Sequence, residues 1–323
     1  MKVLIIKLGA SGDVIRTLPI AQAVRKKYPD SEITWITKEH NMQIFEANPH
    51  VQRVFSIFNY PREFFDILYN FDVDEEATRI AKEINAEKKF GFYNENGYPV
   101  AFNLSAEYYL NTLFDDNLKK TNKRTYQEMM FDAAELPYSK ELPVIVLTDK
   151  EKDYAEKFLR DNNLTQKKLI GIYAGSSPKW PSKVWNFENT KEFIRKINKE
   201  VLLLGGPDEK GKYEELIEEL KEQGIKIYTH DLNCSLRELI SLISLCDEIV
   251  CPDSVSLHIS LALKKPTIGL FFCTSPDEIE GYGTLKKIVS PKLYDFFPEK
   301  QDLYSEELTK SISAEEVLNA LSQ

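Results

Sequence analysis

Short apolar segments alternate with helical segments along most of this chain, and the alternation occurs twice. In the first series, helices are expected at 14–28 and 41–47. The expected strands of that series lie at 3–8, 32–37, 51–58 and 65–71. Strands that alternate with helices form parallel sheets, because a parallel crossover has to cover the sheet before it returns. The first series therefore predicts a doubly wound α/β domain.

A second series starts after Pro143. Its strands are expected at 169–174, 201–206, 225–228, 248–251 and 266–272, and its helices at 151–162, 188–198, 208–223, 235–245 and 254–263. We place the boundary near residue 165, which gives domains of 1–165 and 166–323. Residues 92–125 are rich in Asn, Tyr and Asp and fit neither series; a substrate loop and a packing insertion both remain open.

Composition excludes several classes of protein. A length of 323 residues suits two domains, and a net charge of −9 argues against a general nucleic-acid binder. No apolar segment is long enough for a membrane span, and the first residues lack the features of a signal peptide. We therefore expect a cytoplasmic chain. We also expect a monomer, with any contact with the inner face of the inner membrane being peripheral. Four cysteines without CxxC spacing and four histidines predict no metal site.

The first turn after a strand reads KLGASGD and contains Gly9, Gly12 and Asp13. It lacks G-x-G-x-x-G spacing, and the second strand does not end in an acidic residue, which argues against a dinucleotide site. The glycines allow a tight turn and a close approach by a ligand. Asp13 is either a helix N-cap or a carboxylate that faces a ligand, and the spacing leaves both open.

A second motif, CPDSVSLH, covers residues 251–258 and leads from a strand into a helix. The free amides of residues 254, 255 and 256 predict an anion site, because the first amides of a helix have no carbonyl partner within it. Ser254 and His258 share a helix face. The alternatives are that Asp253 is an N-cap and that His258 is a core histidine.

Other candidates are weaker. The loop 176–185 contains Lys179, Lys183 and three serines, and a lysine there can neutralise a phosphate. Glu209 follows another strand and can accept hydrogen bonds from sugar hydroxyls or simply favour the helix start. The sequence Asp72-Val-Asp74 resembles a metal-binding DxD motif but lies in the acidic run DVDEE, which we interpret as a solvated helix start.

With these motifs in hand, the chain resembles glycosyltransferase family nine, the ADP-heptose:lipopolysaccharide heptosyltransferases. The resemblance rests on VLIIKLGASGDVIRTLP, WPSKVW at 180–185, GGPDE at 205–209, SLREL at 235–239 and Asp253-Ser-x-x-x-His258. It implies a GT-B fold of two Rossmann-like domains, with the acceptor on the first domain and the nucleotide-sugar donor on the second. It also implies that a C-terminal helix at 313–323 packs back on the first domain.

The resemblance further implies roles for individual residues. Asp13 becomes the catalytic base, and Lys183 stabilises the donor phosphates. The donor-binding residues become Ser176, Ser177, Glu209, Cys234, Asp253, Ser254, Val255, Ser256 and His258. Glu209 binds the ribose and Cys234 lies where the main chain contacts adenine. Acceptor-binding candidates are Gly12, Lys7, Arg16 and Arg62.

We therefore expect an inverting, metal-independent transfer of a sugar, a heptose from ADP-heptose, onto a lipopolysaccharide inner-core acceptor, with no cofactor. Three residues depart from the family pattern, because Val255, Lys264 and Phe272 stand where the family has glycine. A β-branched residue does not readily take a positive φ. These departures keep two alternatives open: a GT-B-fold nucleotide-sugar epimerase, and a catalytically altered homologue that only binds a nucleotide sugar.

Overall fold

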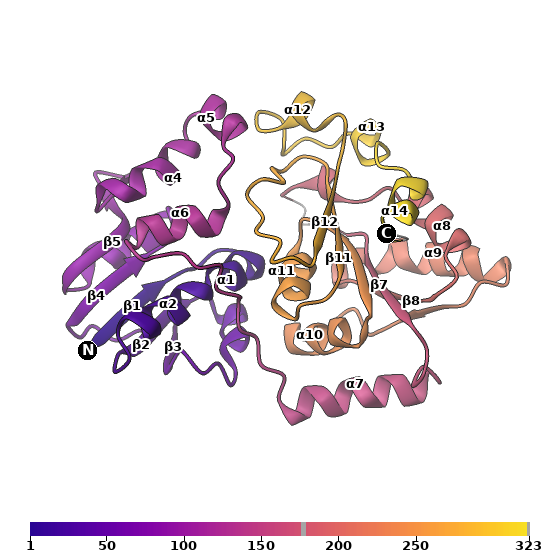
Figure 1. Cartoon of the computed structure of the whole chain (residues 1–323), viewed down its shortest axis with the longest axis horizontal. Coiled ribbons are helices and arrows are strands. Elements are labelled where there is room, and N and C mark those ends of the chain that lie inside the picture. The colour runs from indigo at the N-terminus through magenta and orange to yellow at the C-terminus, as the bar shows by residue number, and fades with distance from the viewer. Residues whose placement is uncertain (176–178, 322–323) are drawn as a thin grey trace. The chain divides into compact units, whose positions relative to one another are not determined.

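Two sheets organise the computed structural model, which describes residues 1–175 and 179–321 (Figure 1). One unit comprises Met1–Val146 with Asp277–Glu280, and the other comprises Leu147–Pro276 with Gly281–Gln323. Each sheet lies within one unit.

The sheet of the first unit has the strand order β3-β2-β1-β4-β5-β6. Its strands are β1 Lys2–Ile6, β2 Glu32–Thr37, β3 Arg53–Ser56, β4 Phe65–Asn70, β5 Ala86–Glu95 and β6 Tyr98–Ala101. All pairs are parallel except the β5–β6 hairpin. The four expected strands are confirmed. The strand order reverses between β1 and β4, and in such sheets ligands bind beyond the strand ends at that point.

The helices of the first unit are α1 Ser11–Thr17, α2 Pro19–Lys27, α3 Glu75–Glu83, α4 Glu107–Thr112, α5 Asp116–Thr121 and α6 Tyr126–Ala133, with 3₁₀ turns at η1 Glu39–Phe45 and η2 Leu104–Ala106. The single helix expected at 14–28 is divided before Pro19, which has no amide hydrogen to continue the ladder. On one face of the sheet, Leu4 and Ile6 pack against Ala77 and Ile80 of α3. Residues 92–125 contain the end of β5, β6 and short helices.

The second unit repeats the topology with the order β12-β11-β10-β7-β8-β9, and all of its strand pairs are parallel. Its strands are β7 Leu169–Tyr173, β8 Glu200–Leu204, β9 Ile227–Thr229, β10 Glu248–Pro252, β11 Thr267–Phe271 and β12 Leu285–Val289. The expected five are confirmed, and β12 is additional. Here the order reverses between β7 and β10, so the loops after these two strands are the expected ligand-binding loops.

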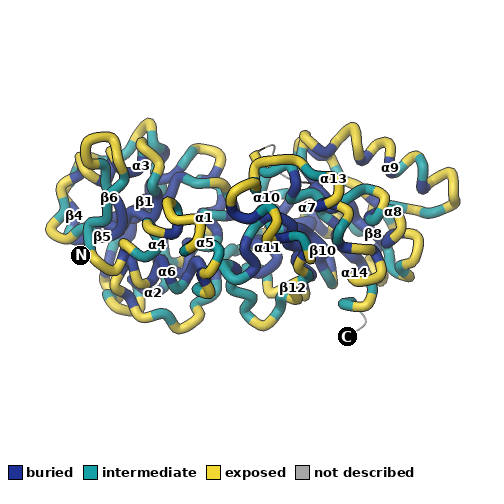
Figure 2. Tube along the Cα trace, turned by 90° about the horizontal axis from the view of Figure 1, so that it is seen from above, coloured by how far each residue is buried: buried dark blue, intermediate teal, exposed yellow. Residues whose placement is uncertain are grey.

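The helices of the second unit are α7 Asp149–Asp161, α8 Phe187–Lys196, α9 Lys210–Glu222, α10 Leu236–Leu245, α11 Val255–Ala262, α12 Leu293–Phe296, α13 Glu306–Thr309 and α14 Ala314–Leu321, with 3₁₀ turns at η3 Pro181–Lys183 and η4 Pro207–Glu209. One core cluster joins strand residues such as Ile172 and Leu203 to Phe193 of α8, Leu216 of α9 and Val317 of α14. Figure 2 shows that central strands such as β1 and β10 are buried, and the outermost strands β6 and β12 are largely not.

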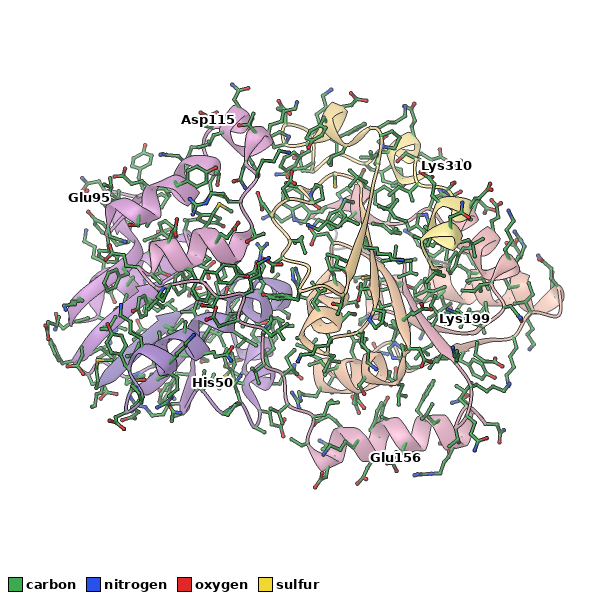
Figure 3. All side chains as sticks on the ribbon, in the orientation of Figure 1. His50, Glu95, Asp115, Glu156, Lys199 and Lys310 are labelled. Atoms are coloured by element: carbon green, nitrogen blue, oxygen red, sulfur yellow. The ribbon has the colours of Figure 1, made fainter. Side chains whose placement is uncertain are left out.

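The chain divides between Val146 and Leu147, well before the expected boundary near residue 165. The reason is that α7 packs on α10 within the second unit, where Glu151 and Arg237 form a buried ion pair of 2.9 Å. The opposite side of α7 is exposed, and Figure 3 labels Glu156 there.

The resemblance implied that the C-terminal helix packs back on the first domain. Helix α14 packs against α8, β11 and β12, all in its own unit. Its buried residues Ala314 and Val317 belong to the core of that unit. Within the described residues, 1–175 and 179–321, no helix is both long and apolar enough to cross a membrane.

Candidate active site

The turn between β1 and α1 places Asp13 in the first turn of α1. The N-cap is Ala10, so the interpretation of Asp13 as an N-cap is wrong. Gly9 lies against the Asp13 side chain: a Cβ at Gly9 would lie 3.0 Å from Asp13 Oδ2 and 3.1 Å from Asp13 Cβ. A larger residue at this position would therefore have to displace the Asp13 side chain.

Arg16 is the charged partner of Asp13, at 2.7 Å between Nη2 and Oδ1. Its guanidinium lies 3.8 Å from the centre of the Tyr126 ring, and the Tyr126 hydroxyl lies 3.0 Å from Thr17 Oγ1. Burial opposes the charge on Arg16, yet Asp13 raises the pKa of the guanidinium above its usual value. Asp13 remains the accessible member of the pair, since 35% of its side chain is exposed against 16% for Arg16.

Lys7 lies beneath this turn and does not face solvent, since it is 3% exposed. Its ammonium donates to Asp72 Oδ1 at 2.7 Å and to the carbonyl of Phe71 at 3.0 Å. Burial opposes the charged form, but attraction to Asp72, and more weakly to Tyr126 and Asp13, raises the pKa of Lys7 well above its ordinary value. The expected acceptor contact of Lys7 is replaced by a buried ion pair.

The interpretation of the DVDEE run as solvated is wrong for Asp72. Asp72 is 7% exposed, whereas Asp74 is exposed at the N-cap of α3. Of the other acceptor candidates, Gly12 is buried in α1 and Arg62 is exposed in the loop between β3 and β4.

In the second unit, Lys183 and Asp253 come together from the loops after β7 and β10. Lys183 Nζ lies 3.0 Å from Asp253 Oδ2, and His258 Nε2 lies 3.8 Å from Asp253 Oδ1. All three side chains are largely buried, with 9–16% of each exposed. Asp253 is not the N-cap of α11, since that position is Ser254. His258 is buried as the core alternative requires, but its side chain is directed at Asp253.

Hydroxyl groups without partners surround the start of α11. Ser254 Oγ and Ser256 Oγ are buried and make no hydrogen bond, and neither does Thr274 Oγ1 after the adjacent strand β11. Buried hydroxyls usually have a partner, so these three groups retain hydrogen-bonding capacity that a ligand or a water molecule could use. Val255 begins α11 and is not among the positive-φ residues, so the β-branched side chain imposes no backbone strain there.

Glu209 lies after β8 and is 5% exposed. Its carboxylate accepts a hydrogen bond of 2.8 Å from the Gly206 amide, and burial raises its pKa. A Cβ at Gly175 would lie 2.2 Å from Glu209 Oε1, so glycine is needed for the two loops to meet.

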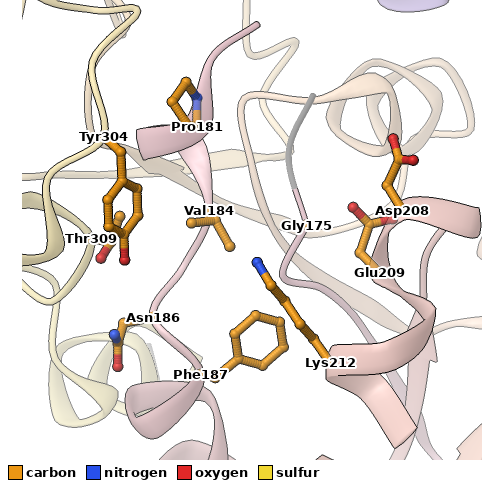
Figure 4. Close-up of a pocket in the computed structure, with 10 residues that line it drawn as sticks. All are labelled: Gly175, Pro181, Val184, Asn186, Phe187, Asp208, Glu209, Lys212, Tyr304 and Thr309. Atoms are coloured by element: carbon orange, nitrogen blue, oxygen red, sulfur yellow. The ribbon is translucent and has the colours of Figure 1, made fainter. Parts of the chain in front are cut away.

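Glu209 also lines a pocket of about 280 Å³ (Figure 4). Asp208 and Glu209 lie on the opposite side of this pocket from Tyr304 and Thr309, and Lys212 extends into the space between them. The pocket therefore combines carboxylates, a cation and aromatic rings.

The remaining candidates have different outcomes. Ser176 and Ser177 lie outside the described residues. Cys234 is half-buried, and burial raises the pKa of its thiol to about 11, which disfavours the nucleophilic thiolate at neutral pH. Lys264 has a φ of 56°, and Phe272 is 1% exposed in the core of its unit. Within residues 1–175 and 179–321, no group of three or more His, Cys, Asp or Glu side chains could hold a metal ion.

Sequence reasoning missed Asp72 as part of the site. It also missed Tyr126, Thr274 and Asn41, whose side-chain amide donates to the Gly9 carbonyl. A signal for Asp72 was available, because Asp72 directly follows an expected strand. The position of Asp72 became informative only once the strand order was known, because that order places β4, the strand before Asp72, beside β1.

Comparison with known proteins shows which family this chain resembles. The family model for glycosyltransferase family 9 (heptosyltransferase) matches residues 61–306. The lipopolysaccharide core heptosyltransferase OpsX of Haemophilus influenzae is 23% identical, over 88% of this chain and 83% of that protein. Lipopolysaccharide heptosyltransferase 1 of Campylobacter coli is 26% identical, over 85% and 84%.

Solved structures show the same fold. A family 9 glycosyltransferase from Veillonella parvula superposes with a TM-score of 0.78, at 18% identity over 99% of this chain and 96% of that chain. The E. coli ADP-heptose lps heptosyltransferase II has a TM-score of 0.72, at 19% identity over 100% and 98%. The GT-B class with two Rossmann-like domains is confirmed. Since the family model covers well over half of its length, this chain belongs to glycosyltransferase family 9 and is a glycosyltransferase.

Proposed function

We propose that this chain transfers a heptose from ADP-heptose onto a lipopolysaccharide inner-core acceptor, with inversion at the anomeric carbon and without a metal ion. The names of the relatives supply the sugar and the acceptor class. The observation that supports the proposal most is the pair of buried, unpartnered hydroxyls at the start of α11, on residues adjoining the Lys183–Asp253 ion pair.

The donor diphosphate is the ligand that this half-site suits. Its oxygens would accept hydrogen bonds from Ser254, Ser256 and the first amides of α11, where the helix dipole also favours an anion. Lys183 would turn from Asp253 to the phosphates and stabilise the charge that develops as the diphosphate leaves. His258 would then remain as the nearby donor to Asp253, and Glu209 would accept a hydrogen bond from a ribose hydroxyl.

Asp13 is the proposed general base. Its partly exposed side chain can accept the proton of an acceptor hydroxyl while Arg16 holds one carboxylate oxygen. The acceptor oxygen then forms a bond to the anomeric carbon as the bond from that carbon to the diphosphate oxygen breaks. The electron pair leaves with the diphosphate and the proton stays on Asp13. A single displacement of this kind inverts the configuration.

The acceptor would lie on the first unit, where Arg16 and Arg62 can attract acidic sugars. The buried Gly12 leaves no side chain between the acceptor and the first turn of α1. We propose that the reaction takes place at the cytoplasmic face of the inner membrane. Peripheral contact there would use apolar side chains such as Leu104 and Phe114, which are 80% and 70% exposed.

Transfer from ADP-heptose to a purified acceptor tests the proposal. Asp13→Asn should bind both substrates and lose transfer by roughly 100-fold or more, since general-base catalysis contributes about 10²–10⁴-fold. Asp30→Asn changes an exposed carboxylate between α2 and β2 and should behave as the unaltered protein. Near-normal transfer by Asp13→Asn would contradict the assigned base. Activity should persist in EDTA, and NMR of the product should show the inverted anomer.

Donor binding has its own test. ADP should raise the melting temperature more than UDP or GDP does, because a ligand that binds only the folded state stabilises it. Ser254→Ala with Ser256→Ala should abolish that shift, whereas Lys196→Met on the exposed side of α8 should not. Incubation with the donor alone separates the epimerase alternative, which predicts an isomerised sugar without any acceptor.

A further inference from the structure

The Asp72 carboxylate holds the turn that carries the catalytic machinery of the first unit. Because β1 and β4 are adjacent and parallel, the residues that follow them meet at one edge of the sheet. Asp72 Oδ2 accepts hydrogen bonds from the amides of Leu8 and Gly9, the latter at 3.1 Å. Its Oδ1 accepts from Lys7 at 2.7 Å. One carboxylate therefore binds three consecutive residues.

The same turn is held from its other side by Asn41. The Asn41 amide donates to the Gly9 carbonyl at 2.9 Å, and Ser11 Oγ donates to Asn41 Oδ1 at 2.8 Å. Gly9 in turn lies against Asp13, as its 3.0 Å virtual Cβ contact shows. Gly9 is therefore the single residue between the Asp72 carboxylate and the Asp13 carboxylate, and a displacement of Gly9 reaches Asp13 directly.

Asp72 is itself fixed. Its amide donates to Asn70 Oδ1 at 3.1 Å, and its carbonyl accepts from Asn70 Nδ2 at 2.9 Å. The same Asn70 amide also donates to the Phe92 carbonyl of β5 at 2.7 Å. The hydrogen bonds thus run from the sheet, through Asp72, to the turn.

The negative charge of Asp72 also neutralises the buried Lys7. The ammonium of Lys7 is buried and attracts Asp13 as well as Asp72. Without the Asp72 carboxylate, a buried and unneutralised cation would remain beside the base. The titratable and charged groups around Asp13 come from several elements of the first unit: Lys7, Arg16, Asp72, Tyr109, Tyr126 and Glu278.

We propose that Asp72 is a positioning residue for the base Asp13. It fixes the Gly9 turn beneath Asp13, and it neutralises Lys7 so that this cation does not hold Asp13 away from the acceptor hydroxyl. The inference rests on the proposed function of Asp13 as general base. Asp72 acts through the turn and touches neither substrate.

Asp72→Asn tests the charge, because it keeps an acceptor oxygen for the amides and removes the neutralising carboxylate. The acidic limb of the kcat/KM profile should move to lower pH, since the free Lys7 charge favours the ionised form of Asp13. We expect kcat to fall roughly 10- to 100-fold, as small displacements of reacting groups cost on the order of 100-fold. The KM for the donor should not change.

Asp74→Asn is the matched control, because it makes the same change two residues away at an exposed carboxylate. It should leave the profile unchanged. The proposal is overturned if Asp72→Asn shows the unaltered pH limb, whatever its kcat, or if Asp74→Asn shows the same shift.

Asp72→Asn leaves a buried cation unpaired and so risks unfolding. The double variant Lys7→Met with Asp72→Ala leaves no such charge and tests the hydrogen bonds to the turn. Its acidic limb should stay at the unaltered pH, while kcat falls roughly tenfold or more because the Leu8 and Gly9 amides lose their acceptor. A kcat within twofold of the unaltered protein would overturn the proposal even if Asp72→Asn cannot be purified.

Asp13→Asn separates this inference from the proposed function. If Asp13→Asn still transfers the sugar at a near-normal rate, the base assignment fails. If Asp13→Asn is inactive and the Asp72 variants behave as the unaltered protein, only the positioning role of Asp72 fails.

Discussion

The ion pair between Glu151 and Arg237 makes a quantitative prediction about the second unit. Glu151 accepts from Arg237 at 3.1 and 2.9 Å and from the Thr148 amide at 2.7 Å. The hydrogen bond from Arg237 is the largest effect, and with the hydrogen bonds from Thr148 it outweighs burial and lowers the pKa of Glu151 from 4.5 to about 2. A difference of this size corresponds to about 3 kcal/mol of unfolding free energy at neutral pH.

The direction in which pH changes the stability follows from the lowered pKa of Glu151. A carboxyl with a lowered pKa in the folded state contributes its full stabilisation above pH 4.5, and the stabilisation is lost as the pH falls towards 2. Glu151→Gln should therefore destabilise the second unit by about 3 kcal/mol at pH 7. Its disadvantage against the unaltered protein should shrink steadily below about pH 4.5.

Urea unfolding in a Trp35→Phe background provides the assay. Of the three tryptophans, Trp180 and Trp185 then remain, and both belong to the second unit. Glu156→Gln is the control on the same helix, since Glu156 and Arg160 form an exposed i,i+4 pair with 67% and 62% of their side chains exposed. Such pairs contribute about 0.5 kcal/mol or less. A loss below about 1 kcal/mol for Glu151→Gln, or one independent of pH, would refute the electrostatic reasoning.

Three further outcomes are expected. Gly9→Ala should lower kcat by roughly 10-fold or more, because its Cβ would lie 3.0 Å from Asp13 Oδ2 and displace the base; unchanged kcat in the transfer assay would argue against that contact. Lys264→Gly should raise stability to urea by about 1 kcal/mol, since Lys264 takes a φ of 56° at the end of α11 and glycine takes it without strain; a loss of stability would be the contrary result. Cys234 should react slowly with iodoacetamide at pH 7.5 and faster towards pH 11, in line with its raised pKa; rapid modification at pH 7.5 would contradict this.

Local patterns were sufficient to predict much of the fold. The apolar segment 32–37 is β2, and Ser235 with Glu238 forms the capping box expected at the start of α10. The hairpin of β5 and β6 also had a local signal, because its turn is Asn96-Gly97 with φ of 53° and 90°. That dipeptide is the common type I′ turn, and the sequence analysis did not use it.

Contacts between distant residues could not be predicted in this way. The domain boundary depends on Glu151, whose partner Arg237 is 86 residues away. The burial of Asp72 depends on Lys7 and on the order of the strands, neither of which the local run DVDEE contains. The hydrophobic periodicity of α14 predicts a buried face but not the surface that covers it, and the helix packs on its own unit.

The short segment Asp277–Glu280 belongs to the first unit although the chain on both sides of it belongs to the second. It supplies the Glu278 carbonyl that accepts from the Tyr126 amide at 2.9 Å, at the start of α6. During synthesis, the first unit therefore lacks one of its own parts until more than 270 residues have been translated. A chimera that exchanges whole units between family members needs three junctions, and one that joins two proteins at residue 146 alone would combine α6 with a foreign partner.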